Sequence, residues 1–352
     1  MKVSLFDPLD LGEITLANRV VMAPMTRNRA GAGDAPTALN AEYYRQRAST
    51  GLIVSEGIQP SKHGKGYFRT PGLYTQAQIA GWHQVTDAVH TAGGRIVAQL
   101  LHCGRIAAAV NKDADAETVA PSAIRANVAI WADGKKVPAD QPRALALAEI
   151  PTLIDEYAAA GRAALAAGFD GVELHCGSGY LPMQFMSTGT NLRTDAYGGS
   201  LCNRLRFVTQ LLEALATACG RARVGLRITP GSTYNDLYDA DPVQTHRALL
   251  QVASALGLAW VHAVRDHVAG IDVAGMVRGC FRGPLILGGG FDGYSAQQVL
   301  ARGQADAVSF GRAIISNPDL VRKLREGLPL TPVKASSVHG SGAAGYTDYP
   351  AS

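Results

Sequence analysis

Short, nearly continuous apolar runs recur along the chain and alternate with longer stretches in which apolar residues have helical spacing. Eight such runs can be distinguished: Arg19–Ala23, Leu52–Ser55, Arg95–Leu100, Gly171–His175, Val224–Ile228, Trp260–Ala263, Leu285–Leu287 and Ala307–Phe310. Continuous apolar runs, rather than strict alternation with polar residues, are typical of parallel strands that are covered outside and packed within. We interpret the eight runs as buried strands of one parallel sheet.

The stretches between these runs predict helices. Amphipathic spacing is found at Ile79–Thr91, Ile150–Ala167, Asn203–Ala218, Pro242–Leu256, Ser295–Ala301 and Pro318–Arg325. Glycine follows several of them, as it commonly does at helix ends. Eight strands joined by right-handed helical crossovers close most economically into a barrel, whereas doubly wound open sheets usually have fewer strands. We therefore predict an α/β fold, a single (β/α)₈ TIM barrel that takes in residues 1–352.

Two segments depart from this regular alternation. Residues 103–148 separate the third strand from the next helix, and connections of such length are usually lids or binding elements. Within them, WADGKKV predicts a hairpin around Asp133–Gly134. Residues 331–352 form a tail rich in Gly and Ser that also carries Tyr346 and Tyr349, which could dock it. We predict a lid-like insertion after strand three and a C-terminal tail on one single domain.

Charge and composition exclude several classes of protein. The 33 basic and 29 acidic residues give a net charge of +4 and are dispersed, which is too weak for a nucleic-acid footprint. The apolar runs are too short to span a bilayer, and the opening MKVSLFDPLD does not match a signal peptide. Five cysteines without metal-binding spacing indicate free thiols and no metal site. We expect a cytoplasmic monomer or homodimer that binds neither nucleic acid nor membrane.

Glycines follow the last two strands, at the barrel end where working residues project. Gly289 and Gly290 come after the seventh strand, and Gly311 and Arg312 come after the eighth. Bare backbone N–H groups can approach phosphate oxygens closely, and arginine adds a bidentate cation. Either pair alone could be a flexible turn or a surface arginine. At these two strands together, a phosphate site is the better interpretation.

Two polar side chains, Gln99 and Arg227, end otherwise apolar strands. A buried amide and a buried guanidinium need hydrogen-bond partners. The pyrimidine edge of a flavin would supply them, and an arginine there would stabilise the negative charge of the reduced ring. Arg227 could also be half of a structural ion pair, so it does not identify a flavin by itself.

The segment ELHCGSGYLPMQF, residues 173–185, carries the sharpest chemical signal. His175 leaves the fourth strand, and Ser178 and Tyr180 follow it, interleaved with glycines that let the chain fold back over the strand ends. Histidine and serine can donate to a carbonyl oxygen conjugated with an alkene, and tyrosine can protonate the carbon. The alternative is a buried histidine and tyrosine that merely satisfy a loop.

Several sequence segments, spread over almost the whole chain, match the conserved segments of one protein family and occur in the same order. They include LFDPLDLGEITLANRVVMAPMTRNRA, QLLHCGR, APSAI, NLRTDAYGGSLCNR, AVSFGRAIISNPDL and GYTDYP. Together they resemble the old yellow enzymes, a family of flavin-dependent alkene reductases. The resemblance implies an FMN cofactor, NADPH or NADH as hydride donor, and a small electron-poor alkene as substrate, an α,β-unsaturated carbonyl or nitro compound.

The resemblance also implies roles for individual residues. Tyr180 matches the family's proton donor, and His175 with Ser178 matches the pair that holds the substrate oxygen. Tyr67 and Tyr346 match aromatic positions of the substrate pocket. Contacts to FMN are implied for Ala23, Pro24, Thr26, Gly57, Gln99, Arg227, Gly289, Gly290, Gly311 and Arg312.

Two positions depart from the family's pattern. The family has His or Asn three residues after His175, whereas this chain has Ser178, whose shorter side chain donates a single hydrogen bond. The familiar Trp after the strand-three Gln-Leu pair is Leu101, which removes a large pocket wall. We expect weaker polarisation of the substrate and room for bulkier molecules. An alternative function is therefore a pathway-specific flavin-dependent desaturase or isomerase acting on a bulky substrate.

Overall fold

The centre of the computed structural model, which describes residues 3–132, 134–265 and 270–351, is a closed barrel of parallel strands. Each barrel strand lies on one of the eight apolar runs, so the predicted TIM barrel is confirmed, and nearly all of its strand residues are buried. Around the barrel, in chain order, the strands are β3 (Val20–Met22), β4 (Leu52–Ile58), β5 (Ile96–Leu100), β10 (Gly171–Cys176), β11 (Val224–Ile228), β12 (Trp260–Val264), β13 (Leu285–Gly288) and β14 (Ala307–Phe310).

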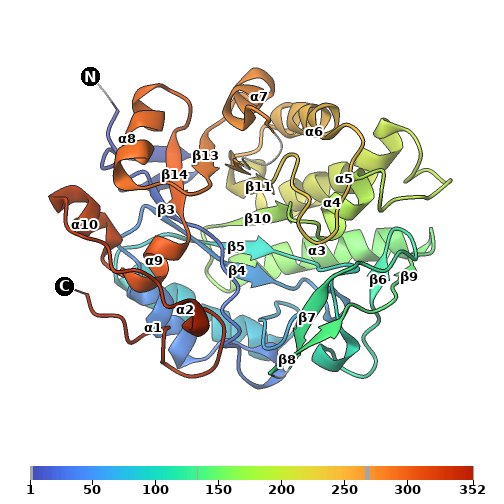
Figure 1. The fold of residues 1–352 in the computed structure, drawn as a ribbon, viewed down its shortest axis with the longest axis horizontal. Coiled ribbons are helices and arrows are strands. Elements are labelled where there is room, and N and C mark those ends of the chain that lie inside the picture. The colour runs from blue at the N-terminus through green and yellow to red at the C-terminus, as the bar shows by residue number, and fades with distance from the viewer. Residues whose placement is uncertain (1–2, 133, 266–269, 352) are drawn as a thin grey trace.

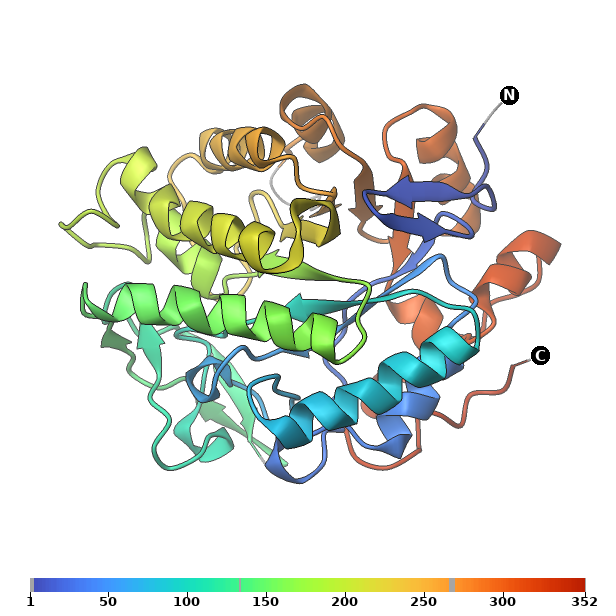
Figure 2. The same cartoon turned by 180° about the vertical axis from the view of Figure 1, so that it is seen from behind.

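Helices surround the barrel (Figures 1 and 2). They are α1 (Ala38–Arg45), α2 (Gln76–Thr91), α3 (Glu149–Ala166), α4 (Leu181–Met186), α5 (Leu201–Cys219), α6 (Pro242–Leu256), α7 (Val273–Cys280), α8 (Gly293–Ala301), α9 (Arg312–Ser316) and α10 (Leu320–Glu326). In α5, Leu205, Val208 and Leu212 have helical spacing and are buried, and the Ser200 hydroxyl caps the first turn. Over the described ranges, none of the helices has the length and apolar character needed to cross a bilayer.

An N-terminal hairpin that the sequence did not predict closes one end of the barrel. Strands β1 (Leu9–Leu11) and β2 (Ile14–Leu16) pair antiparallel. Their leucine and isoleucine side chains share one buried cluster with Leu52 and Trp260, which begin β4 and β12. The hairpin therefore covers the amino ends of the strands, and the carboxyl ends remain for a site (Figure 2).

The insertion forms small sheets of its own. Its strands are β6 (Val119–Ala120), β7 (Ala129–Ala132), β8 (Lys135–Pro138) and β9 (Arg143–Ala144). Strands β7 and β8 pair antiparallel, so the predicted hairpin is present, although Asp133 lies outside the described residues. Strands β6 and β9 pair parallel. The division of the chain into barrel, insertion and tail stays a prediction.

The tail runs back over α1 and the loop that follows β3 (Figure 1). Two buried arginines of that loop hold it. The guanidinium of Arg27 donates to the carbonyl oxygens of Val338 and Gly345, at 2.9 and 2.6 Å, and Arg29 donates to that of Gly342 at 3.0 Å. The end of the chain is thereby fastened to its first barrel segment.

Candidate active site

A small cavity of about 160 Å³ lies at the carboxyl ends of the barrel strands. Its lining is Pro24, Thr26, Gly57, Gln99, Leu101, His175, Ser178, Tyr180, Arg227 and Tyr234. The sequence singled out every one of these residues except Tyr234. The parallel topology brings them together, because all eight strands end on the same side of the barrel.

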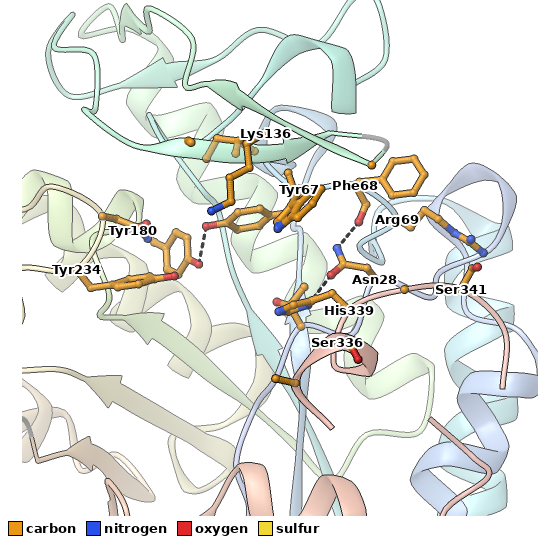
Figure 3. Close-up of a pocket in the computed structure, with 18 residues that line it drawn as sticks. Asn28, Tyr67, Phe68, Arg69, Lys136, Tyr180, Tyr234, Ser336, His339 and Ser341 are labelled. Atoms are coloured by element: carbon orange, nitrogen blue, oxygen red, sulfur yellow. Dashed lines mark hydrogen bonds between the residues drawn. The ribbon is translucent and has the colours of Figure 1, made fainter. Parts of the chain in front are cut away.

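A larger cavity of about 880 Å³ adjoins the small one, because both are lined by Thr26, Tyr180 and Tyr234. Its other walls come from outside the barrel. Figure 3 shows Lys136 reaching from the β7–β8 hairpin toward Tyr67, with tail residues on the opposite side. The insertion and the tail thus contribute walls of a space large enough for a drug-sized ligand.

Tyr180 lies at the junction of the two cavities. Its hydroxyl is 3.1 Å from the hydroxyl of Tyr67, and its ring centroid is 5.2 Å from that of His175. Burial raises the pKa of both tyrosines, so both phenols stay protonated at neutral pH. The hydroxyl of Tyr180 therefore carries a proton that it can donate, and the hydroxyl of Tyr67 is its hydrogen-bond partner.

His175 is buried and uncharged. Burial and the nearby Arg227 lower the pKa of His175 to about 3. Among the described residues, its Nδ1 atom has no hydrogen-bond partner although it is buried. An imidazole in this state can hold a ligand oxygen or nitrogen by a hydrogen bond without placing a positive charge beside it.

Ser178 has an unusual backbone conformation. Its φ of 53° lies in the left-handed region. Thr229 Oγ1 accepts from its N–H at 2.7 Å, and its carbonyl oxygen accepts from the Asn235 side chain at 2.8 Å. The backbone is held on both sides, so the side chain projects from a fixed position in the cavity wall.

Gln99 and Arg227 are supported from below by buried polar groups. The amide nitrogen of Gln99 donates to Glu173 at 2.9 Å, and Nη1 of Arg227 lies 2.7 Å from Nε2 of His262. Both side chains also line the small cavity, so their remaining polar atoms are available to a ligand. The flavin edge predicted from the sequence would find a donor and acceptor set here.

The glycines after β13 and β14 leave an open cradle. A Cβ added to Gly290 would meet nothing described within 4 Å, and one added to Gly311 would meet only a methionine sulfur at 3.7 Å. Gly289 has a φ of 119°, which a side chain would strain, and its carbonyl oxygen accepts from Arg265 at 2.7 Å. Arg312 is exposed. The cradle fits the FMN phosphate, while the unpartnered imidazole and the small cavity fit the ring.

Tyr346, predicted for the substrate pocket, is not among the residues that line the two cavities at the barrel mouth. Its side chain is fully buried and lies outside the linings of both cavities. Its ring stacks on Tyr43 at a centroid distance of 4.0 Å, lies under Arg29, and its hydroxyl accepts from Asn40 at 3.1 Å. Packing and cation–π contacts hold it in the core. His339 is the ring side chain that the described part of the tail contributes to the larger cavity.

Three residues near the site were missed. Tyr234 lies in the loop after β11, where a search of strand-end loops could have found it. Arg265 directly follows β12, where a search of the strand-end residues could also have found it. His339 stands in the irregular tail, where no periodic pattern tells which side chains face inward.

The fold and the site define a class: a flavin-dependent oxidoreductase built on a (β/α)₈ barrel. Its carboxyl-end cavity is lined by Gln99 and Arg227, and glycines follow the last two strands, as a phosphate-bearing cofactor would require. Residues 4–331 match the model of the NADH:flavin oxidoreductase / NADH oxidase family. The chain belongs to this family.

Relatives that match over nearly their whole length place it among the old yellow enzymes. A probable flavin mononucleotide-dependent alkene reductase of Leishmania infantum is 39% identical over an alignment of 355 positions, which covers 97% of this chain and 96% of that protein. A morphinone reductase in complex with tetrahydroNAD is 42% identical, with a TM-score of 0.95 and coverage of 99% of this chain and 98% of that one. An old yellow enzyme homologue from Zymomonas mobilis is 40% identical, with a TM-score of 0.95 and coverage of 99% for each chain. The family resemblance, the FMN cofactor and the NAD(P)H-dependent oxidoreductase class are confirmed.

Proposed function

We propose that the protein reduces the activated carbon–carbon double bond of an α,β-unsaturated carbonyl or nitro compound, with NADPH or NADH as electron donor. The observation that carries this proposal is the placing of one acid and one neutral donor, Tyr180 and His175, at a single cavity that Gln99 and Arg227 also line. The FMN, when bound, supplies the hydride.

The side chains divide the remaining work. His175 and Ser178 hold the activating oxygen of the substrate by hydrogen bonds and draw electron density from the alkene. Tyr180 gives a proton to the α-carbon, and the adjacent Tyr67 steadies its hydroxyl. Leu101 leaves space beside them for a bulky substituent.

FMN would be held along the barrel mouth. Gln99 and Arg227 would contact the pyrimidine edge of the ring, while Ala23, Pro24, Thr26 and Gly57 would lie along the rest of it. Gly289, Gly290, Gly311 and Arg312 would cradle the phosphate. We also infer a cytoplasmic location, since all five cysteines are free, and a monomer or homodimer as the working form.

Three measurements test the proposed function. The purified protein should be yellow, NADPH or NADH should bleach it without oxygen, and 2-cyclohexenone or a nitroalkene should restore the colour with formation of the saturated product. A colourless protein that does not take up added FMN would contradict the cofactor site. A bleached protein that no enone or nitroalkene reoxidises would contradict the reaction.

A second candidate function rests on Ser178 and Leu101. With one short donor in place of a longer one and a missing pocket wall, a bulky substrate could be desaturated or isomerised instead of reduced. Product analysis with and without nicotinamide separates the two functions: conversion of a candidate substrate without NADPH or NADH favours the second.

A further inference from the structure

A buried polar network fills the barrel interior below the small cavity. Its centre is Glu173 on β10, whose side chain is fully buried. One carboxylate oxygen, Oε1, accepts from Nε2 of Gln99 at 2.9 Å. The other, Oε2, accepts from Nε1 of Trp260 at 3.0 Å and lies 3.0 Å from Nδ1 of His262. Strands β5 and β12 thus supply the donors of this set.

Elementary hydrogen-bond rules fix the protons of this network. Nδ1 of His262 lies 3.0 Å from Oε2 of Glu173, and an ionised carboxylate can only accept, so the ring proton sits on Nδ1. Nε2 is then an acceptor, and the Ser309 hydroxyl at 2.8 Å can donate to it. Nη1 of Arg227 lies against the same ring, 2.7 Å from Nε2 and 3.1 Å from Nδ1. Burial and Arg227 lower the pKa of His262, so the ring is neutral.

The amide of Gln99 is fixed by the same logic. An ionised carboxylate accepts hydrogen bonds and cannot donate, so Gln99 must turn its NH₂ group toward Glu173. Its carbonyl oxygen then remains for the small cavity, where an imide N–H of a pyrimidine ring is a matching donor. The orientation of this amide is thus set by the buried acid and not by the cavity.

Glu173 is ionised at neutral pH. Burial by itself would raise the pKa of Glu173, but His262, Arg227 and the hydrogen bond from Trp260 together lower it to about 2. Within the described part of the chain, the carboxylate reaches Arg227 through the neutral imidazole of His262 and not by a direct ion pair. The negative charge of Glu173 is therefore separated by the ring of His262 from Arg227, the cation that lines the cavity.

We propose that Glu173 is a positioning residue for the flavin, which orients Gln99 directly and Arg227 through His262, and whose negative charge keeps the reduction potential of bound FMN below the value that Arg227 alone would set. The inference rests on the proposed FMN site. Reduced flavin is favoured by positive charge at its pyrimidine edge, so a negative charge behind that edge opposes reduction. In a buried site such a charge acts over several ångströms with little screening.

The variant Glu173→Gln tests the charge, since it keeps the size of the side chain. We expect the oxidised-to-reduced equilibrium of bound FMN to shift about tenfold toward the reduced form, a rise of about 30 mV in the midpoint potential for a two-electron couple. Potentials are measured at pH 6 by anaerobic titration against a reference dye. Glu56→Gln is the matched control, because Glu56, which precedes the cavity-lining Gly57 in β4, is also buried but is mainly protonated at pH 6, with a pKa that burial raises to about 7.

Glu173→Asp separates charge from position. Aspartate keeps the negative charge, but its shorter side chain lies farther from Gln99 and His262 and no longer orients them. The reduction potential should therefore stay near that of the unaltered protein, while the dissociation constant for FMN rises. An unchanged potential in a folded, yellow Glu173→Gln protein would overturn the proposal. So would an equal rise in the Glu56→Gln control.

A measurement on the unaltered protein avoids any failure of a variant to fold. The ¹⁵N shifts of the His262 ring should show a neutral imidazole with its proton on Nδ1. An imidazolium, or a proton on Nε2, would overturn the arrangement. Failure of the proposed function has a different signature, namely an unaltered protein that binds no FMN or is not reoxidised by enones.

Discussion

Replacing Tyr180 by phenylalanine separates the two halves of the catalytic cycle. The substitution removes one hydroxyl and nothing else, so the protein loses the 3.1 Å contact between the hydroxyls of Tyr180 and Tyr67. A neutral hydrogen bond of this kind contributes about 1 kcal/mol to the free energy of unfolding, so the variant should stay folded and yellow.

The effect on rate should fall on one half-reaction. Proton donation by a positioned side chain typically contributes about 10² to 10⁴ in rate, so reoxidation by an enone should slow by that factor. Reduction of the flavin by NADPH or NADH needs no proton from Tyr180 and should change by less than about twofold. Anaerobic stopped-flow measurement of flavin absorbance reports the two steps separately.

Tyr67→Phe is the matched control. It breaks the same hydrogen bond and costs the same stability, but it leaves the Tyr180 hydroxyl in place. If the lost hydrogen bond raises the activation free energy of reoxidation by about 1 kcal/mol, the rate of reoxidation should fall about fivefold. A Tyr180→Phe protein that slows equally in both half-reactions, or a Tyr67→Phe protein that slows as much in reoxidation, would refute the assignment of the acid.

Three further predictions concern other parts of the molecule. Burial raises the pKa of Glu56 from 4.5 to about 7, so the folded state binds a proton that the unfolded state releases, and the free energy of unfolding should fall by about 3 kcal/mol as the pH rises through this window. Denaturant titrations at several pH values should show that Glu56→Gln removes this decline. Tyr346→Phe should lower the free energy of unfolding by about 1 kcal/mol, because the hydrogen bond from Asn40 is lost, and should leave the KM for the alkene unchanged. His339→Ala should change that KM, because His339 lines the larger cavity. A changed KM in Tyr346→Phe and an unchanged KM in His339→Ala would show that Tyr346 contacts the substrate. With a thiol reagent under native conditions, Cys202 should react first because it is the exposed cysteine, with the half-buried Cys280 following more slowly. A Cys202→Ser protein that is labelled as fast as the unaltered one would contradict the described burial.

The barrel could be predicted because its strands are buried on both faces. Strands of this kind appear in the sequence as continuous apolar runs, and each of the eight predicted runs contains one barrel strand. The hairpin β1–β2 was missed because its strands have three residues each and become buried only against the finished barrel end. A window that short holds no readable period.

The residues at the strand ends could be predicted for the same topological reason, since parallel strands of a barrel deliver them to one place. Side chains of irregular segments could not. Tyr346 and His339 lie in the same tail, yet the tyrosine packs in the core against Tyr43 and the histidine lines the larger cavity. The partners of Glu173 were equally hidden, because Gln99, Trp260 and His262 stand 74, 87 and 89 positions away.

The clamp between the first barrel segment and the tail has a consequence for biosynthesis. A nascent chain that ends after β14 already contains all eight barrel strands. Arg27 and Arg29, synthesised near the beginning, still lack carbonyl partners that arrive only with the last residues. The wall that the tail adds to the larger cavity can therefore form only after all the barrel strands have been synthesised.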